Sequence, residues 1–167
     1  MKPDQQIKEK YVLYYKDDLD KLDRILEEYL RLSKAKCTLL IDKDGHLVTK
    51  QGQTGTYDMD TISALVAGSF AATKEMAKLL GEEEFSVLFH QGMKDAIQLS
   101  LIGERTLLAT IFDDKTTVGM VRLYSNEASR KLGGILIELK DRKGEGPLAK
   151  GFGAAAQGKL DEMFGKS

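Results

Sequence analysis

MDTISALVAGSFAATKEMAKLLG, residues 59–81, has the length and composition of one long helix, and the rest of the chain is arranged around it. Asp60 or Thr61 is expected to cap its start, because a short oxygen side chain accepts a hydrogen bond from a free backbone N–H. Gly81 is expected to end it, because glycine adopts the left-handed conformation of a helix cap without a steric cost.

This helix contains two kinds of apolar residue, bulky ones expected to face a core and small ones that form a second row. The bulky set is Ile62, Leu65, Val66, Phe70, Met76, Leu79 and Leu80, and the small set is Ala64, Ala67, Gly68, Ala71 and Ala72. Gly68 costs a helix interior roughly 1 kcal/mol relative to alanine, so another interaction must offset that cost. We therefore predict that one side of the helix packs on its own sheet and the other on a partner. The simpler alternative is that the small residues only let the helix lie close to its own sheet.

One helix and one hairpin are predicted before this central helix. Residues 17–34 carry apolar side chains at spacings of three and four, which is typical of an amphipathic helix. Residues 36–42 and 46–51 have the pattern of two strands, and the Asp-Gly pair between them tolerates the positive φ of a tight hairpin. Residues 1–15 form either a loose arm or an additional edge strand.

Three strands and a last helix are predicted after the central helix. The strands are residues 85–90, 96–102 and 106–112, separated by glycine-containing turns. The helix follows a run of capping residues, although residues 118–124 also fit a strand. Its apolar face comprises Val121, Tyr124, Ala128, Leu132, Ile135, Leu136 and Leu139. The resulting class is α+β, with a largely antiparallel sheet between helices and with the first and last helix on the same side.

The C-terminal part has a different composition. Residues 143–158 contain five glycines, four alanines and one proline, which predicts a flexible linker. Leu160, Met163 and Phe164 follow it as a single apolar turn, typical of a short linear motif. The sequence thus predicts an arm over 1–15, one folded domain over 16–142 and a tail over 143–167.

Composition excludes several classes of function. The 167 residues carry a net charge of −1, so no strong field attracts nucleic acid or anionic lipid. Cys37 is the only cysteine, which excludes an internal disulfide, and its strand-like neighbours predict a buried apolar role. The absence of a long apolar run and of a signal peptide indicates a cytoplasmic protein. The acidic run at 82–84 is expected to be a solvated connector.

No catalytic pair, cofactor site or metal site is predicted. Residues 42–45, DKDG, resemble the start of a calcium loop, but glycine comes fourth rather than sixth, and Gln53 stands where that loop needs glutamate. The ending GKS resembles a phosphate-binding loop, but Leu160 occupies the place of its first glycine. His46 and His90 have no cysteine or acidic residue at ligand spacing.

Four phrases resemble the roadblock/dynein light chain family: LLIDKDGHLV, TISALVAGSFAATKEMAKLLGE, FHQG and LLATIFDDKTTVGMVRL. The resemblance covers about residues 17–140. It is strongest to bacterial members that act with a Ras-like small GTPase in cell polarity and motility. It implies a profilin-like, three-layer domain with a five-stranded, mostly antiparallel sheet in the order αββαβββα.

The resemblance also implies a two-fold homodimer, made by pairing edge strands and placing two copies of the central helix side by side. The edge-strand residues would be Phe85, Val87, Leu88 and Phe89. The GTPase-binding positions carried over onto this sequence are Ala64, Gly68, Ala71, Ala72 and Glu75. Their spacing of three to four residues places them on one stripe of a helix. The tail residues Leu160, Met163 and Phe164 would contact the GTPase elsewhere.

The implied activity is activation of GTP hydrolysis, together with promotion of nucleotide exchange, by a protein without catalytic residues or cofactor of its own. Such a protein acts by binding the active arrangement of the GTPase, which then uses its own residues on the water and the γ-phosphate. The family's polarity role implies a cytoplasmic protein concentrated at a cell pole. The alternative is a structural scaffold of the same fold that joins other proteins without affecting GTP hydrolysis.

Overall fold

The computed structural model describes the backbone of residues 3–145 and the side chains of residues 16–141. Three helices and five strands follow one another in the predicted order αββαβββα. They are α1 (Pro3–Ser33), β1 (Cys37–Asp42), β2 (Leu47–Gly52), α2 (Met59–Leu79), β3 (Val87–Gln91), β4 (Ala96–Ile102), β5 (Thr106–Phe112) and α3 (Val118–Glu145). The packing described below is that of the unit that ends at Gly133.

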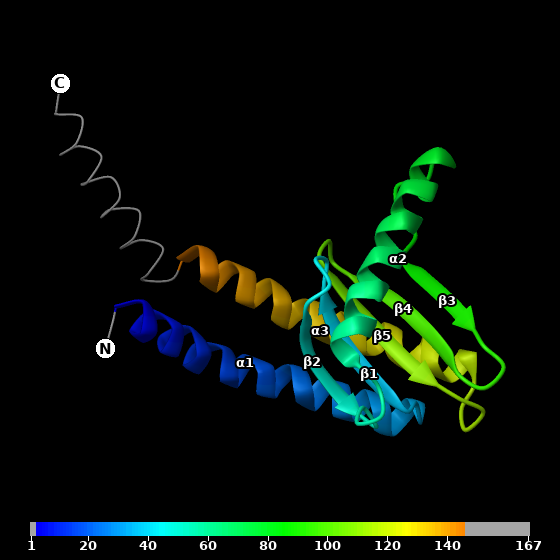
Figure 1. Ribbon diagram of the computed structural model, residues 1–167, viewed down its shortest axis with the longest axis horizontal. Coiled ribbons are helices and arrows are strands. Elements are labelled where there is room, and N and C mark those ends of the chain that lie inside the picture. Colours follow the sequence, from blue (N-terminus) through cyan, green and yellow to red (C-terminus); the bar gives the residue numbers. More distant parts are fainter. Residues whose placement is uncertain (1–2, 146–167) are drawn as a thin grey trace. The chain divides into compact units, whose positions relative to one another are not determined.

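The sheet has the strand order β2-β1-β5-β4-β3, and every neighbouring pair is antiparallel (Figure 1). Ala109 at the centre of β5 lies opposite Leu39 on β1 and Leu99 on β4. The Asp-Gly turn joins β1 and β2 as predicted, but of its two residues only Gly45 takes a positive φ, at 92°, and the β1–β2 pairing shifts register beside it. The two edges of the sheet are therefore β2 and β3.

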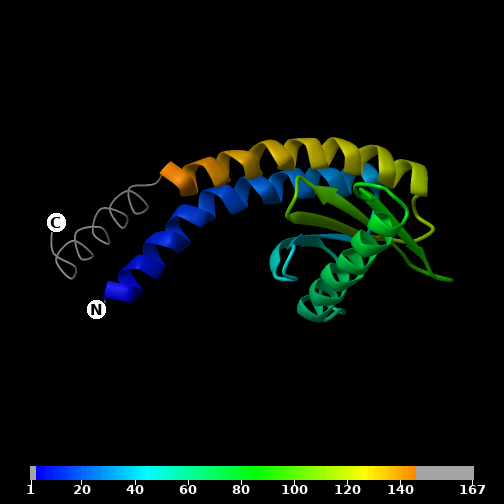
Figure 2. The same cartoon turned by 90° about the horizontal axis from the view of Figure 1, so that it is seen from above.

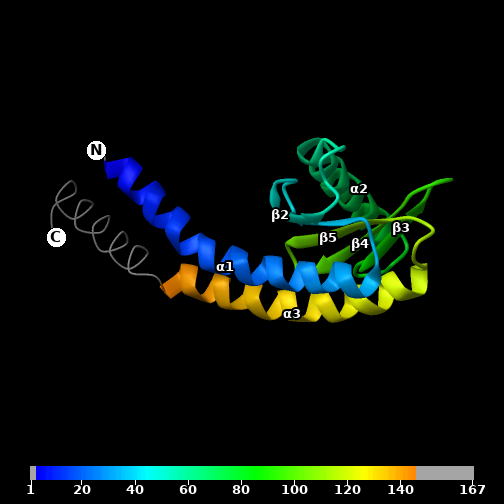
Figure 3. The same cartoon turned by 90° about the horizontal axis from the view of Figure 1, so that it is seen from below.

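The helices cover the two faces of this sheet unequally. Figures 2 and 3 show α2 alone on one face and α1 with α3 on the other, which confirms the predicted three layers. The face under α2 is apolar and contributes Cys37, Leu39, Ile41, Leu99, Leu107, Ala109 and Ile111 to one buried cluster with Val66 and Phe70 of α2. Each fully buried leucine or isoleucine contributes about 1.5–3 kcal/mol to folding. Burial raises the pKa of the Cys37 thiol to about 11, as its predicted apolar role requires.

The opposite face of the sheet carries a buried polar row. The Tyr29 hydroxyl of α1 lies 2.8 Å from Thr110 Oγ1 on β5. The Gln98 side-chain amide donates to Ser125 Oγ of α3 at 2.8 Å, and the Thr38 hydroxyl donates to the Ala109 carbonyl. Burial raises the pKa of Tyr29 to about 12, and its hydrogen bond to Thr110 only partly opposes this. These bonds fix α1 and the first turns of α3 on the sheet, since an unmatched buried hydroxyl or amide is costly.

Both ends of the described chain are more helical than predicted. Residues 3–15 are neither an arm nor an edge strand, because α1 begins at Pro3 and continues without a break to Ser33. Proline suits the first turn of a helix, and the Gln, Lys and Glu that follow favour helix over strand. Residues 118–124 are helical rather than extended, with the Thr117 hydroxyl accepting from Met120 N at 3.2 Å. Helix α3 ends at Glu145, inside the segment predicted as a linker.

Within residues 3–145, no helix has both the length and the apolar composition needed to cross a bilayer.

Candidate partner-binding site on helix α2

Helix α2 is closed at both ends by local hydrogen bonds. Asp58 is the N-cap, and its two carboxylate oxygens accept from Thr61 N at 3.1 Å and from the Thr61 hydroxyl at 2.7 Å. These bonds lower the pKa of Asp58. The predicted cap at Asp60 or Thr61 is therefore wrong, because Asp58 accepts the bonds and Thr61 donates them. The predicted stop at Gly81 is confirmed by its φ of 75°, after which Glu82 N donates back to the Ala77 carbonyl.

The inward side of α2 follows a strict helical period. Apart from Ala67, its buried residues follow one another at alternating spacings of four and three positions. The buried residues are Met59, Ser63, Val66, Ala67, Phe70, Thr73 and Ala77. The two hydroxyls among them are satisfied within the helix, Ser63 donating to the Met59 carbonyl and Thr73 to the Ser69 carbonyl. One face of α2 is thus fully committed to the sheet.

The structure brings the predicted GTPase-binding residues together on the opposite side of α2. Ala64, Gly68, Ala71, Ala72 and Glu75 are all exposed. Ala67, which the sequence placed in the same small row, is buried instead. A Cβ added at Gly68 would meet no atom within 4 Å, so no contact inside the described fold requires glycine there.

Four of the bulky residues predicted for the core are exposed on α2 or at its end. The exposed fractions are 68% for Leu65, 53% for Met76, 88% for Leu79 and 72% for Leu80. Figure 1 gives the reason for the last three, because the C-terminal turns of α2 project past the sheet. Leu65 lies in the N-terminal half of α2, outside the set of buried residues. Spacing in the sequence distinguishes these exposed residues from the buried ones, because Leu65 and Met76 do not fall at the alternating spacings of four and three that the buried residues follow.

The two flanks of α2 face different edges of the sheet. Gly45 in the β1–β2 turn comes so close that an added Cβ would lie 3.0 Å from the Ala64 Cα and 3.5 Å from the Ala67 Cβ. That flank therefore faces the turn next to the β2 edge. Leu65 and Met76 lie on the other side of the helix from Ala67, because 3.6 residues complete a turn. Their flank faces the β3 side of the sheet.

The β3 edge lacks the features that normally prevent strands from pairing. The β2 edge carries the exposed Lys50, and its pairing with β1 is interrupted by a register shift. Strand β3 reads VLFHQ, without lysine, proline or irregular pairing. Leu88 packs with the cluster under α2, and Phe89 stacks on Phe112 with ring centroids 6.0 Å apart. An open, regular and apolar edge of this kind is a template for another strand.

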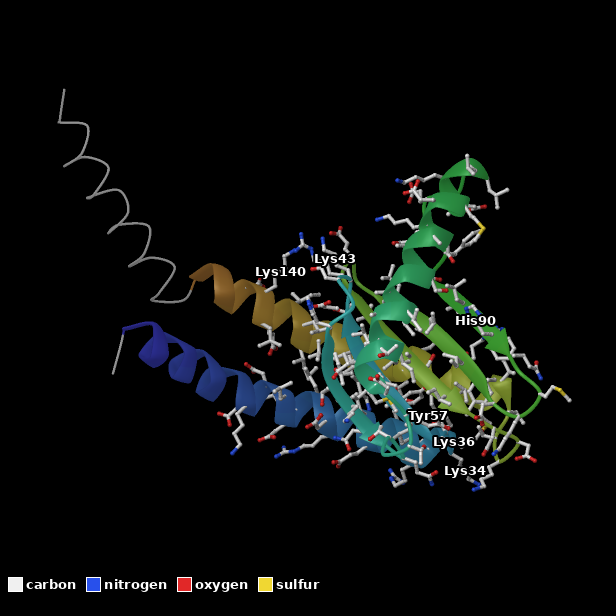
Figure 4. All side chains as sticks on the ribbon, viewed as in Figure 1. Lys34, Lys36, Lys43, Tyr57, His90 and Lys140 are labelled. Carbon is white, nitrogen blue, oxygen red and sulfur yellow. The ribbon has the colours of Figure 1, made fainter. Side chains whose placement is uncertain are left out.

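The predicted edge residues lie as expected, except that the strand starts later. Val87, Leu88 and Phe89 are on β3, whereas Phe85 precedes it and is half-buried. Figure 4 shows His90 on the same outer strand. Strand β3 is thus an edge of the sheet, and its pairing with a second copy stays a prediction.

An ion-pair cluster fixes the turn between β3 and β4. Lys36 Nζ lies 2.9 Å from Asp95 Oδ1 and 3.9 Å from Asp113 Oδ2. Its hydrogen bond to Asp95 raises the pKa of Lys36, and a further bond to Tyr57, which lies beside it in Figure 4, acts in the same direction. This cluster joins the start of β1 to the loops before α2 and after β5, and it holds the base of the β3–β4 turn.

The β1–β2 turn gathers one group that the sequence analysis missed. The side chains of Asp42, Asp44 and His46 lie together, with one possible ligand atom from each within 4.8 Å of the others. Partial burial raises the pKa of Asp42, but hydrogen bonds from His46 and Asp44 outweigh this effect and lower it overall. Asp42 accepts from Asp44 N and His46 N at 2.9 Å each, and its other oxygen lies 3.1 Å from the His46 ring. The group closes the hairpin turn. The prediction that His46 has no acidic residue at ligand spacing is therefore wrong, because the turn brings Asp42 and Asp44, four and two residues earlier, beside it.

The known family model for the Roadblock/LC7 domain matches residues 21–112. This chain belongs to the Roadblock/LC7 family. The matched residues include the C-terminal part of α1, all of α2 and the whole sheet, and they end before α3.

Three solved structures of family members are similar over most of the chain. MglB of Myxococcus xanthus is 38% identical, with a TM-score of 0.70, and the match covers 72% of this chain and 90% of that one. The gliding protein MglB of Thermus thermophilus is 35% identical, with a TM-score of 0.69 and coverage of 72% and 92%. A structure of MglB with a tetrameric arrangement is 34% identical, with a TM-score of 0.70 and coverage of 72% and 91%.

The predicted tail contacts Leu160, Met163 and Phe164 lie outside the described residues. Within the described residues, the candidate site consists of the outward face of α2 and the neighbouring edge of the sheet at β3.

Proposed function

We propose that this roadblock protein is a homodimeric regulator of a Ras-like small GTPase of the MglA type and that it activates GTP hydrolysis. The observation that supports this most is Gly68, in the middle of an exposed row of alanines on α2. Glycine costs a helix roughly 1 kcal/mol relative to alanine, and nothing within 4 Å of this position in the described fold accounts for it. Close approach of a partner's backbone accounts for both the glycine and the alanines.

The proposed dimer explains the second exposed set on α2. Two copies paired along β3 form one continuous sheet and bring the flanks with Leu65 and Met76 towards each other. Burying such side chains between copies removes apolar surface from water. The small row, which faces away from the sheet, then remains accessible to the GTPase. The similarity to MglB, including a structure with a tetrameric arrangement, supports self-association.

The proposed mechanism is selection of the active conformation. The row on α2 offers methyl groups, an exposed backbone and Glu75, whose carboxylate is 3.0 Å from Lys78 Nζ. In this mechanism none of these groups acts directly on the γ-phosphate or on the attacking water. Binding to this row accelerates hydrolysis by favouring the GTPase conformation in which its own catalytic groups are aligned.

Phosphate release tests the proposal. The GTP-loaded cognate GTPase is expected to release phosphate faster with the protein than without it, at a rate that saturates with protein concentration. Binding without any change in the rate would instead establish the scaffold function. No binding at all would contradict both.

The tail has a separate proposed role, in which Leu160, Met163 and Phe164 contact the GTPase away from α2 and promote nucleotide exchange. A chain that ends at Glu145 keeps the whole of α3 and removes only this segment. It is expected to dimerise normally and to bind the GTPase more weakly, with slower exchange of a fluorescent nucleotide. Unchanged binding and exchange would contradict the tail contact but not the α2 site.

A further inference from the structure

The turn between β3 and β4 presents an isolated positive charge. Its residues are Gly92, Met93, Lys94 and Asp95, and Met93 is fully exposed. Asp95 is paired with Lys36 at 2.9 Å, so its charge is neutralised inside the fold. Lys94 is exposed and forms no ion pair within residues 16–141. The tip of this hairpin therefore carries one unmatched cation and one uncovered apolar side chain.

The segment that leads into β3 has the opposite character. Glu82, Glu83 and Glu84 are all exposed and form no ion pair within the same residues. Leu80, just before them, is 72% exposed. The segment continues directly into the sheet, since the Ser86 carbonyl already accepts from Leu101 N at 2.9 Å. One end of the β3 edge is thus acidic and the other basic.

These opposite ends meet when β3 pairs with itself. In a two-fold antiparallel pair, residues at equal distances before and after the axis lie opposite each other. With the axis beside Leu88 or Phe89, near the middle of β3, Lys94 of one copy lies opposite residue 82 or 84 of the other. The arrangement is isologous, so the contact forms twice in each dimer.

We propose that the Lys94 tip of each copy binds the Glu82–Glu84 segment of a second copy, and that this contact sets the register of the β3 pairing. It rests on the homodimer of the proposed function and adds the residues that select the partner. Met93 packs against the partner's exposed apolar surface near the end of α2. A slipped alignment moves Lys94 away from the partner's glutamates and loses the attraction, and a parallel alignment brings like charges together, so both are disfavoured.

A charge-swap pair of variants tests this contact. Lys94→Glu places glutamate opposite the partner's three glutamates, and the triple variant Glu82→Lys, Glu83→Lys, Glu84→Lys places lysines opposite Lys94. Each variant alone repels its own copy at both ends, so its self-association is expected to weaken roughly tenfold at low salt. A mixture of the two restores attraction at both ends. Native mass spectrometry of the mixture is expected to show heterodimers well above the statistical half.

The controls separate this contact from the dimer itself. Lys43→Glu makes the same charge change in the exposed β1–β2 turn and is expected to leave self-association unchanged. Wild-type association is expected to weaken with added salt, a measurement that does not depend on any variant folding. If both variants dimerise as tightly as the wild type and their mixture contains only the statistical half of heterodimers, the proposed contact is wrong, whereas the dimer itself is not contradicted. A monomeric wild-type chain would overturn the dimer as well.

Discussion

Helices α1 and α2 both present one face to solvent, and those two faces differ in chemistry. Every exposed residue of α1 between 16 and 33 is charged. The exposed face of α2 instead contains Ala64, Leu65, Gly68, Ala71, Ala72, Met76 and Leu79 beside a few charged residues. A helix face that stays in water gains little from exposed leucine or methionine and loses stability at glycine, whereas charge keeps it soluble. This difference supports the proposal that another molecule binds on α2 rather than on α1.

The largest effect is expected from placing charge on the flank of α2 that faces the β3 edge. Leu65→Asp combined with Met76→Asp should weaken self-association about a hundredfold or more, since burying a leucine or methionine side chain contributes about 1.5–3 kcal/mol. The free energy of unfolding at low concentration should change little, because both side chains are exposed. Analytical ultracentrifugation measures the association. A matched change on α1, Arg24→Asp with Arg31→Asp, should leave self-association unchanged. If both pairs of substitutions weaken self-association equally, the proposed difference between the two helices is wrong.

A smaller effect is expected where α1 meets the sheet. Tyr29→Phe leaves Thr110 without its 2.8 Å partner and should lower the free energy of unfolding by about 1–2 kcal/mol at neutral pH. The pKa of Tyr29 is raised to about 12 in the fold, so wild-type stability is intact below pH 10 and falls as the pH rises from 10 to 12. The variant should lose less stability over that interval. Urea unfolding at several pH values measures the free energy of unfolding of both proteins. An equal loss of stability between pH 10 and 12 in the wild type and the variant would contradict the raised pKa of Tyr29.

The smallest effect, and the most specific, is expected at Gly68. Gly68→Ala should raise the free energy of unfolding by roughly 0.8–1 kcal/mol, because the added methyl meets nothing within 4 Å. The same methyl should reduce affinity for the GTPase. Gly134→Ala on α3 is the matched control, since its added methyl is also free of contacts and should stabilise the helix without affecting GTPase binding. A stabilised Gly68→Ala protein with full affinity would show that glycine is not needed for close approach.

Local patterns in the sequence were sufficient to predict most of the fold. Strands 96–102 and 106–112 have the predicted bounds, set by the turns on either side, and Gly81 ends α2 because few other residues adopt its φ of 75°. The N-cap was misplaced because Asp58, Asp60 and Thr61 can all accept a hydrogen bond. Which of them does so depends on where the backbone changes from extended to helical, and this occurs at Asp58. The helix over residues 3–15 was missed because its YVLYY run is equally typical of a strand.

The outward face of α2 was predicted only in part. The small row was found because its members share one stripe, whereas Leu65, Met76 and Leu79 were assigned to the core by their size alone. A large apolar side chain is buried only where another element packs against it. How far α2 extends beyond the sheet depends on tertiary structure, so the sequence did not show which of these residues would lack such a neighbour. The dimer and the tail contacts depend on other copies or on residues outside the described chain, so they remain predictions.

The most direct test of the central claim, that the outward face of α2 binds the GTPase, is a calorimetric titration of the GTP-loaded MglA-type GTPase into three proteins. These are the wild type, Ala71→Arg on the small row, and Asn126→Arg, which adds the same side chain at an exposed position on α3. The wild type and Asn126→Arg should bind alike, whereas Ala71→Arg should remain dimeric and show no measurable binding, because arginine cannot fit a close contact. Equal binding by all three would contradict the claim.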